Sequence, residues 1–483
     1  MHIQQLMQQS GVGFGTSGAR GTVEAMTNPV CHAYTLGFIQ ALRADGSLQA
    51  GATVFLAGDL RPSTPRILAA VARALRDAGC RPRYCGRLPS PAIAFHAMQQ
   101  GCASIMVTGS HIPDDRNGIK FNRPEGEILK SDEARIREQR VQQPEPFPDI
   151  GPQDLPPEDP AAREAYRARY TGFFSPDALA GLKLGVYQHS GVARELLPEI
   201  LTALGAEVTP LARSEHFIPV DTEAIRPEDI ELARRWAREY GFDAIVSTDG
   251  DADRPLLADE RGEWLRGDVL GVLCARALGI RELVTPVSSN SLVEACGAFA
   301  RVHRTRIGSP YVIEAMQQAL AEGAVPVAGY EANGGFLLAS ALERGGRRLA
   351  ALPTRDAVLP LVAVLAEART RAMPLSRLIE DLPPRFTASD RLKDFPTDIA
   401  HRRIAELAAS PAAIEAMFGQ LCGRLAATDP TDGLRMRFAN DEIIHLRPSG
   451  NAPELRCYNE AASPTRAREL NQACLQRLAA WRA

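Results

Sequence analysis

A serine and a histidine directly follow an apolar run in the first third of the chain. The run CASIMV ends at Val107, and the next residues, TGSHIPDDRNGIKF, include Ser110, His111 and Lys120. A serine hydrolase is disfavoured because no Gly-x-Ser-x-Gly turn surrounds Ser110. The chemistry of this loop must therefore depend on other segments of the chain.

Three aspartates with period-two spacing follow a second apolar run. Asp249, Asp251 and Asp253 lie in STDGDADRP, directly after AIV. Carboxylates this close repel one another unless a cation offsets their charge, and oxygen ligands suit Mg²⁺. A calcium EF-hand loop is the nearest rival, but Arg254 and Pro255 would occupy its sixth and seventh positions, and a strand leads into it. The segment predicts a Mg²⁺ site rather than a solvated acidic turn.

Two further loops carry groups that suit a sugar phosphate. In VAGYEANGGF, Glu331 and Asn333 offer an acceptor and a mixed donor and acceptor, which fit paired sugar hydroxyls but also an ordinary turn. The second loop, in RPSGNAPELRCYNE, can donate to a phosphate but also fits a plain hairpin. Its candidate contacts are Arg447, Ser449, Gly450, Asn451 and Arg456.

Two arginines near the N-terminus are weaker candidates. FGTSGARG places Arg20 among glycines, which let the backbone approach a ligand closely. AGDLRPST adds Asp59 and Arg61 after another strand-like run, and an internal ion pair is at least as good an interpretation of that pair.

Composition and charge narrow the class of protein. At 483 residues the chain is too long for one hydrophobic core, and a formal net charge of −3 gives no reason to expect nucleic acid or a membrane as a partner. The first residues lack the features of a secretory signal, and no apolar run could span a bilayer, so we expect a cytoplasmic protein. Nine scattered cysteines favour reduced thiols over disulfides or a zinc site.

The elements that must position these loops alternate along most of the chain. Strand-like runs and helical periodicity alternate in three successive α/β units, the second preceded by a proline-rich and acidic linker, PEPFPDIGPQDLPPEDP. The tail after DLPPRF differs, because helical segments there accompany the alternating runs GLRMRFA, EIIHLRP and ELRCYNE. This tail predicts an antiparallel sheet with helices.

Taken in order, the quoted segments resemble the α-D-phosphohexomutase family. The match extends from Phe14 to Glu460, nearly the whole chain. The resemblance implies an α/β fold with four domains around a central cleft, of which three are related α/β domains with mixed sheets and the C-terminal one is α+β. We place the serine loop, the metal loop, the sugar loop and the phosphate loop in domains at residues 1–155, 156–258, 259–372 and 373–483, respectively.

The resemblance also implies reversible transfer of a phosphoryl group between the 1- and 6-positions of a hexose. Ser110 is expected to carry that group and to join the three aspartates as a Mg²⁺ ligand, with a hexose 1,6-bisphosphate as intermediate and activator. The groups expected to assist the transfer are His111, Lys120, Arg20 and Arg254. Glu331 and Asn333 are expected to take sugar hydroxyls, while the C-terminal loop anchors the phosphate that does not react.

Mannose phosphates are the expected substrates, because STDGDADRPLLADERGEWLRGD resembles bacterial members that act on them. Glucose phosphates, alone or together with mannose phosphates, are the alternative, and a sugar phosphate-binding protein without turnover is a third. Retention of Ser110 and all three aspartates argues against the third. Gly335 stands where mannose-handling members often carry a histidine, so the resemblance leaves the proton carrier open. The sequence also leaves open whether the protein is a monomer or a homodimer.

Overall fold

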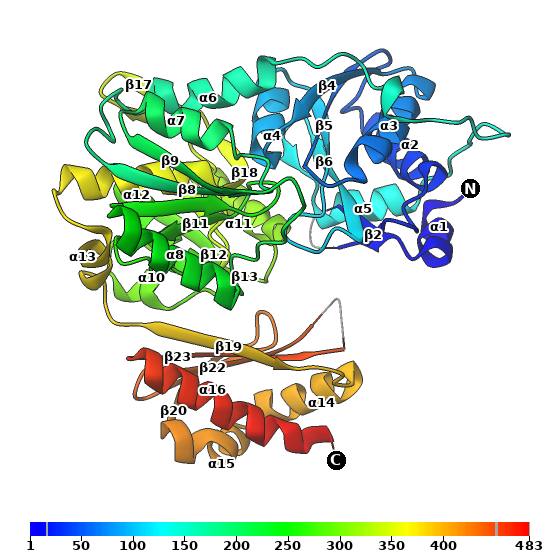
Figure 1. Cartoon of the computed structure of the whole chain (residues 1–483). Helices are drawn as coiled ribbons and strands as arrows, with labels where there is room; N and C mark the ends of the chain where they lie inside the picture. The colour runs from blue at the N-terminus through cyan, green and yellow to red at the C-terminus, as the bar shows by residue number, and fades with distance from the viewer. Residues whose placement is uncertain (16–17, 450–452, 483) are drawn as a thin grey trace. The chain divides into compact units, whose positions relative to one another are not determined.

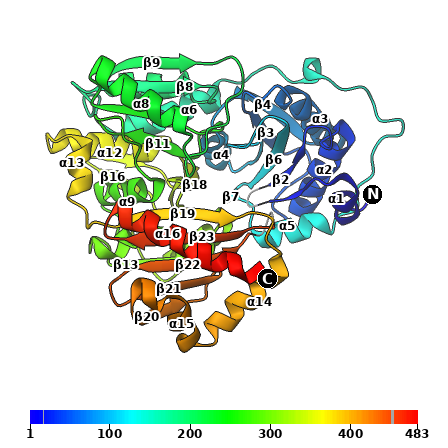
Figure 2. The same ribbon diagram turned by 60° about the horizontal axis from the view of Figure 1, so that its bottom comes forward.

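The structure is a computed structural model that describes residues 1–15, 18–449 and 453–482, and it divides into two compact units. The first unit comprises residues 1–281 and 308–378, and the second comprises residues 282–307 and 379–483. Figures 1 and 2 trace the chain from the N-terminal helix α1 to the C-terminal helix α16. Within the described residues, none of the helices is both long and apolar enough to cross a bilayer.

The N-terminal part of the chain forms a seven-stranded mixed sheet with helices packed against it. Its strands are β1 (Gly13–Phe14), β2 (Ala19–Thr22), β3 (Thr53–Gly58), β4 (Arg81–Arg87), β5 (Ala103–Val107), β6 (Arg116–Arg123) and β7 (Gly126–Glu127). Its helices are α1 (Ile3–Ser10), α2 (Asn28–Ala44), α3 (Thr64–Asp77), α4 (Ser90–Gln99) and α5 (Lys130–Arg137). β5, β3 and β4 run parallel, whereas β6 is antiparallel to β5 and β2, so the segment with Ser110 is the connection of a β5–β6 hairpin.

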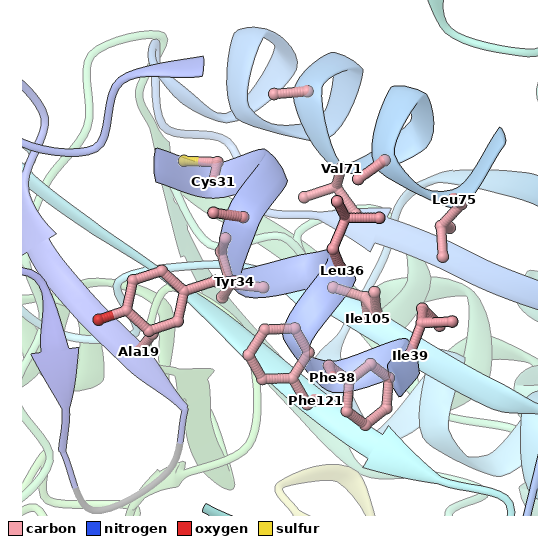
Figure 3. Packing of buried hydrophobic residues seen from close by; sticks show 14 of the residues in the cluster. Ala19, Cys31, Tyr34, Leu36, Phe38, Ile39, Val71, Leu75, Ile105 and Phe121 are labelled. Atoms are coloured by element: carbon pink, nitrogen blue, oxygen red, sulfur yellow. The ribbon is translucent and has the colours of Figure 1, made fainter. Parts of the chain in front are cut away.

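The core of this domain fixes which way β6 presents its side chains. Phe38 of α2 stacks on Phe121 of β6 with ring centroids 4.7 Å apart (Figure 3). Ile119 and Phe121 belong to this core and are almost fully buried. Because side chains alternate between the two faces of a strand, Lys120 points away from the core and toward the loops described below.

The second α/β segment has a four-stranded sheet in the order β11-β10-β8-β9. Its elements are α6 (Ala161–Phe173), β8 (Lys183–His189), α7 (Leu196–Ala203), β9 (Glu207–Arg213), α8 (Pro227–Tyr240), β10 (Ala244–Thr248) and β11 (Pro255–Ala258). β10 and β9 run parallel to β8, and β11 returns antiparallel to β10. The three aspartates lie in the β10–β11 connection, so the predicted strand does lead into their loop.

The third segment contributes elements to both units. Its elements are α9 (Gly267–Leu278), β12 (Glu282–Pro286), α10 (Leu292–Ala295), β13 (Arg301–Thr305), α11 (Ser309–Ala321), β14 (Val327–Tyr330), β15 (Phe336–Leu338), β16 (Leu342–Arg344), β17 (Arg347–Leu349), β18 (Leu352–Asp356), α12 (Val358–Thr370) and α13 (Leu375–Glu380). In the first unit, β14, β15 and β18 form an antiparallel ladder. In the second unit, β12 and β13 run parallel.

The C-terminal part forms the predicted antiparallel sheet, which has five strands in the order β19-β23-β22-β21-β20. Its elements are β19 (Phe386–Leu392), α14 (Thr397–Ala408), α15 (Pro411–Cys422), β20 (Leu425–Asp429), β21 (Leu434–Phe438), β22 (Ile443–Pro448), β23 (Leu455–Ala461) and α16 (Pro464–Ala479). The three helices lie on one face of the sheet (Figure 1), where their apolar side chains form a core with those of the strands.

Candidate active site

Ser110 is held in a strained and buried turn at the end of β5. Its φ angle is 56°, in the left-handed region that non-glycine residues rarely adopt, and the residue is 1% exposed. Its backbone N–H donates to Thr108 Oγ1 at 2.8 Å, and Thr108 Oγ1 in turn donates to the buried Asp59 at 2.7 Å. Such strain persists only where surrounding contacts offset it, and it is common at functional turns.

Arg61 supplies those contacts. The residue is 1% exposed, and all five N–H donors of its guanidinium are used within the protein. The acceptors are the Asp59 carboxylate and the backbone carbonyls of Ser110, Ile112, Pro113 and Arg116. The predicted ion pair with Asp59 is therefore present, with Nε 3.0 Å from Oδ2, and Arg61 fixes the serine loop rather than a ligand.

The aspartate loop faces this serine. Ser110 Oγ donates to Asp249 Oδ2 at 2.6 Å, while Asp249 Oδ1 accepts the backbone N–H groups of Asp253 and Arg254, each at 3.2 Å. Ala252, with φ of 56°, makes the tight turn that brings the aspartates together. All three aspartates are buried.

Lys120 orients the other two aspartates. Its Nζ donates to Asp251 Oδ2 at 2.5 Å and to Asp253 Oδ2 at 2.6 Å, and Ser90 Oγ donates to the same Asp251 oxygen at 2.6 Å. The Oδ1 atoms of Asp251 and Asp253 are buried and have no hydrogen-bond partner among the described residues. Since a buried carboxylate oxygen is costly to leave without a partner, these two atoms indicate that a cation belongs between the three carboxylates.

One oxygen from each of the three aspartates lies within 4.8 Å of the others, so the donor set fits a small divalent cation. Burial raises the pKa of Asp249 well above its usual range, and Asp251 and Asp253 raise it further. Burial also acts to raise the pKa of Asp251 and Asp253, but contacts with Lys120, and for Asp253 with Arg355, bring both below the ordinary value.

The other predicted groups of the reaction centre surround Ser110. His111 Nδ1 lies 3.4 Å from Ser110 Oγ, and burial together with the nearby Arg254 lowers the pKa of His111 to about 3. Burial and Arg254 also lower the pKa of Arg20 to about 10, which leaves it charged at pH 7. Arg254 Nε is buried 3.6 Å from Asp253 Oδ1 and has no hydrogen-bond partner among the described residues, as expected of a donor built to meet a ligand.

The predicted sugar loop reaches the aspartate loop through an arginine that the sequence did not single out. Glu331 Oε2 accepts from Arg355 Nη1 at 2.8 Å, and Arg355 donates to Asp253 Oδ2 from Nε at 3.1 Å and from Nη2 at 2.9 Å. Asn333 Oδ1 accepts the backbone N–H of Gly335 at 3.0 Å, so that part of its side chain shapes its own loop. The structure thus brings Ser110, the aspartates and Glu331 into one network.

The predicted phosphate loop belongs to the second unit. Gly450 and Asn451 lie outside the described residues. Arg447 on β22 and Arg456 on β23 are directly opposite each other, so their side chains share one face of the sheet. Arg447 Nε donates to Asp432 Oδ1 at 2.9 Å, and the backbone N–H of Ser449 donates to the Glu454 carbonyl at 2.8 Å. Like-charged neighbours on one face make a suitable anchor for an anion.

Models of the phosphoglucomutase/phosphomannomutase α/β/α domains I, II and III match residues 11–145, 165–262 and 266–386. The chain belongs to the phosphoglucomutase/phosphomannomutase family. A phosphomannomutase of Sinorhizobium fredii is 46% identical over 460 residues, which cover 95% of this chain and 96% of that protein. A phosphomannomutase of Salmonella muenchen is 44% identical over 462 residues, 95% of this chain and 94% of that one.

A solved structure supports the fold across the whole length. The putative phosphomannomutase from Thermus thermophilus superimposes with a TM-score of 0.74 at 21% identity, covering 97% of this chain and 99% of that chain. The predicted α-D-phosphohexomutase resemblance and the fold of three α/β domains followed by a further C-terminal domain are therefore confirmed. As a member of this family, the protein is an enzyme of the isomerase class that transfers phosphoryl groups.

Sequence reasoning missed Arg355 and Ser90, because neither lies in a recognisable motif. Arg355 lies near the end of a strand in LPTRDAV, and its partners are 24 and 102 residues away. A charged residue at the carboxyl end of a strand was the only available signal. Gly335 gains a structural explanation, because a Cβ atom there would lie 2.7 Å from Arg355 Cδ and 2.9 Å from the Asp253 carbonyl oxygen.

Proposed function

We propose that the protein is a phosphomannomutase, which interconverts mannose 1-phosphate and mannose 6-phosphate. The observation that carries the proposal is Ser110 Oγ at 2.6 Å from the first of three clustered aspartates. A buried serine that faces a cation site has the surroundings that a phosphoserine needs, because its two negative charges require compensation. Mannose as the sugar is supported by the relatives at 46% and 44% identity.

In this proposal Ser110 carries the phosphoryl group in the resting enzyme. In the first half-reaction, the bond from phosphorus to Ser110 Oγ breaks as phosphorus bonds to O6 of mannose 1-phosphate, whose hydroxyl proton leaves to a base. In the second half-reaction, the phosphoryl group at position 1 returns to Ser110 Oγ, and O1 takes up a proton. Mannose 1,6-bisphosphate is the intermediate, and a hexose 1,6-bisphosphate would serve as activator by restoring phosphoserine.

The residues around Ser110 divide the work of charge stabilisation. Asp249, Asp251 and Asp253, together with an oxygen of the phosphorylated Ser110, would hold Mg²⁺, which when bound would offset and polarise the charge on the phosphoryl group. Arg20 and Arg254 would donate to the phosphoryl oxygens. Lys120 remains charged at pH 7, because Asp251 and Asp253 raise its pKa by more than burial lowers it. His111, which is neutral at that pH, would complete the polar wall beside Oγ.

The substrate's other groups are assigned to two separate loops. Glu331 and Asn333 would accept and donate to the sugar hydroxyls. The anchor for the phosphate that does not react would consist of Arg447, Ser449, Gly450, Asn451 and Arg456. Between the half-reactions the bisphosphate must turn end for end, so we propose that the anchoring domain, at residues 373–483, moves relative to the loops that carry Ser110, the aspartates and Glu331. The cytoplasmic location, and the choice between monomer and homodimer, stay predictions.

Phosphorus NMR tests this proposal directly. The purified protein, with Mg²⁺ and a trace of hexose 1,6-bisphosphate, is given mannose, glucose or glucosamine 1-phosphate in separate samples. We expect conversion of mannose 1-phosphate to the 6-phosphate, and none by the Ser110→Ala protein. Faster conversion of glucose 1-phosphate would reassign the sugar, in line with the other activity that the family description includes. Release of inorganic phosphate without a 6-phosphate would overturn the mutase proposal.

A further inference from the structure

Arg355 bonds to both an aspartate of the cation site and the carboxylate of the sugar loop. Its Nε and Nη2 bond to Asp253 Oδ2, and its Nη1 bonds to Glu331 Oε2 at 2.8 Å. The side chain is 3% exposed, so water screens these contacts little. The donors of a planar guanidinium point in fixed directions. Movement of the Arg355 guanidinium toward Asp253 would therefore weaken its bond to Glu331, and the reverse.

The surrounding structure fixes the position of Arg355. Asp356, the next residue, accepts the hydroxyl groups of Tyr166 and Tyr170 from α6 at 2.8 and 2.5 Å, and these contacts are buried. These two hydrogen bonds from α6 hold the end of β18 in place. Gly335 leaves room for the Arg355 side chain, because a Cβ atom at position 335 would lie 2.7 Å from Arg355 Cδ.

The arrangement also determines which oxygen of Asp253 can meet a cation. Lys120 and Arg355 together donate three hydrogen bonds to Asp253 Oδ2. Asp253 Oδ1 is left buried and without a hydrogen-bond partner among the described residues. The charge of Arg355 opposes a cation at Oδ1 unless other carboxylates offset it, and Glu331, which bonds directly to Nη1, does so more strongly than Glu127.

We infer that Arg355 is a positioning residue that couples the cation site to the sugar loop, so that the charge of Glu331 sustains cation binding at Asp253 through Arg355. This inference rests on the proposed function, because it takes the aspartates as the cation site and Glu331 as the sugar ligand. Since coupling between two sites is reciprocal, an ion at the aspartates also fixes Glu331 for the sugar. A ligand that changed the hydrogen bonds of Glu331 would then change the affinity of the aspartates for the cation.

A double-mutant cycle on Mn²⁺ affinity tests the inference without relying on turnover. Binding of Mn²⁺ alone is measured by electron paramagnetic resonance for the wild type, Glu331→Gln, Arg355→Met and the double variant. We expect Glu331→Gln to weaken Mn²⁺ binding by about fivefold when Arg355 is present, within the range that coupled neighbours show. In the Arg355→Met background the same change should have an effect of less than about twofold, as direct charge alone would give at that separation.

Glu127 provides the matched control. Its carboxylate accepts from Thr354 Oγ1 and from Ser309 Oγ at 2.9 Å, and Ser309 Oγ accepts from Arg355 Nη1 at 3.3 Å, so Glu127 reaches Arg355 through a hydroxyl group rather than directly. Glu127→Gln removes the same charge and should leave Mn²⁺ affinity within about twofold. If Arg355→Met does not fold, as judged by its thermal unfolding, the cycle is run with Arg355→Lys, which keeps the charge but loses the forked geometry.

The outcomes separate this inference from the proposed function. Equal effects of Glu331→Gln in both Arg355 backgrounds, in a protein that binds Mn²⁺ and converts mannose 1-phosphate, would overturn the coupling alone. A wild-type protein that neither binds Mn²⁺ nor converts the sugar would overturn the proposed function itself. A fivefold effect that disappears with Arg355, together with an unchanged Glu127→Gln protein, would support the coupling.

Discussion

The Ser110 centre and the Arg447 loop are both proposed to bind phosphate, yet they are built differently. At the Ser110 centre, Lys120 and Arg355 each bond to two carboxylates, and their side chains are 10% and 3% exposed. In the second unit, the Arg447 side chain bonds through Nε to one carboxylate among the described residues, that of Asp432, and is 18% exposed. A buried network resists rearrangement, whereas a partly exposed arginine can exchange a carboxylate for a phosphate at lower cost.

This difference suggests a division of labour. The first site holds its charges in place before substrate arrives, which is what preorganised electrostatic stabilisation requires. In the proposed function, the second site would bind a phosphate that has to be released when the bisphosphate turns.

Removing one aspartate should break the preorganised site. We expect Asp249→Asn to lower kcat by about a thousandfold or more, because the loss of one negative ligand removes several kcal/mol of charge stabilisation. The change also removes the acceptor for Ser110 Oγ. Steady-state kinetics with mannose 1-phosphate measures the effect. Asp243→Asn, at an exposed position of the same domain, is the control and should retain wild-type kcat. A variant at position 249 within tenfold of wild type would contradict the proposed role of Asp249.

Removing the charge of Lys120 should leave the repulsion between the buried aspartate carboxylates uncompensated and so destabilise the folded protein. Without added metal, we expect Lys120→Met to lower the free energy of unfolding by about 3 kcal/mol, since it leaves buried carboxylates with fewer partners. Mg²⁺ should restore part of this loss by taking over the charge compensation. Urea unfolding followed by tryptophan fluorescence, with and without Mg²⁺, provides the measurement. The exposed Lys183→Met serves as the control. A loss that Mg²⁺ does not reduce would mean that Lys120 has a packing role only.

The Arg447 loop should respond in substrate affinity rather than in the chemical step. We expect Arg447→Met to raise KM for mannose 1-phosphate by about thirtyfold, the value of one charge-assisted hydrogen bond, and to change kcat much less. Arg437→Met is the matched control, because Arg437 is an exposed arginine of the same sheet that pairs with Asp441. If kcat fell as far as in the Asp249 variant, the two sites would not divide the work as proposed.

The smallest effect concerns the acid stability of the second unit. His445 is buried, its Nε2 lies 2.7 Å from the Asp432 carbonyl, and burial lowers its pKa to about 4. In the unfolded chain His445 has a pKa of about 6.5, so below that pH the unfolded chain binds a proton that the folded domain does not. The free energy of unfolding that is present above pH 6.5 is therefore lost as the pH falls toward 4. From pH 7 to pH 5 we expect a loss of about 2 kcal/mol from this group.

A single tryptophan can report that loss. Trp481 packs against the core of the C-terminal domain, so a protein with Trp236 and Trp264 replaced by phenylalanine would report on this domain. His445→Gln should remove about 2 kcal/mol of the difference in unfolding free energy between pH 7 and pH 5. An unchanged pH dependence would show that the ring titrates normally.

The sequence allowed the candidate site residues to be predicted where they lie just after a strand. Ser110 and the three aspartates each lie shortly after an apolar run, and β5 and β10 end just before them, at Val107 and Thr248. The role of Arg61 was only partly accessible, because its ion pair with Asp59 is local, whereas the carbonyls that it binds are 49 to 55 residues away. Every residue has a backbone carbonyl, so the residue types do not show which carbonyls will accept from Arg61.

Arg355 shows the same limit more sharply. Its neighbours along the chain, Thr354 and Asp356, suggest an ordinary polar strand end, and Gly335 looks like one more flexible turn residue. Only packing reveals that Gly335 leaves the space that the Arg355 side chain fills. The phosphate loop was predicted as a unit, but Gly450 and Asn451 lie outside the described residues, so their contribution stays a prediction.

Transfer of a labelled phosphoryl group through Ser110 tests the central claim most directly. The protein is incubated with Mg²⁺ and hexose 1,6-bisphosphate that carries radioactive phosphorus, separated from small molecules, digested, and analysed before and after a chase with mannose 1-phosphate. We predict label on the peptide that contains Ser110, none on the Ser110→Ala protein, and complete transfer of the label to sugar phosphate in the chase. Label on the Ser110→Ala protein, or its release only as inorganic phosphate, would contradict the account.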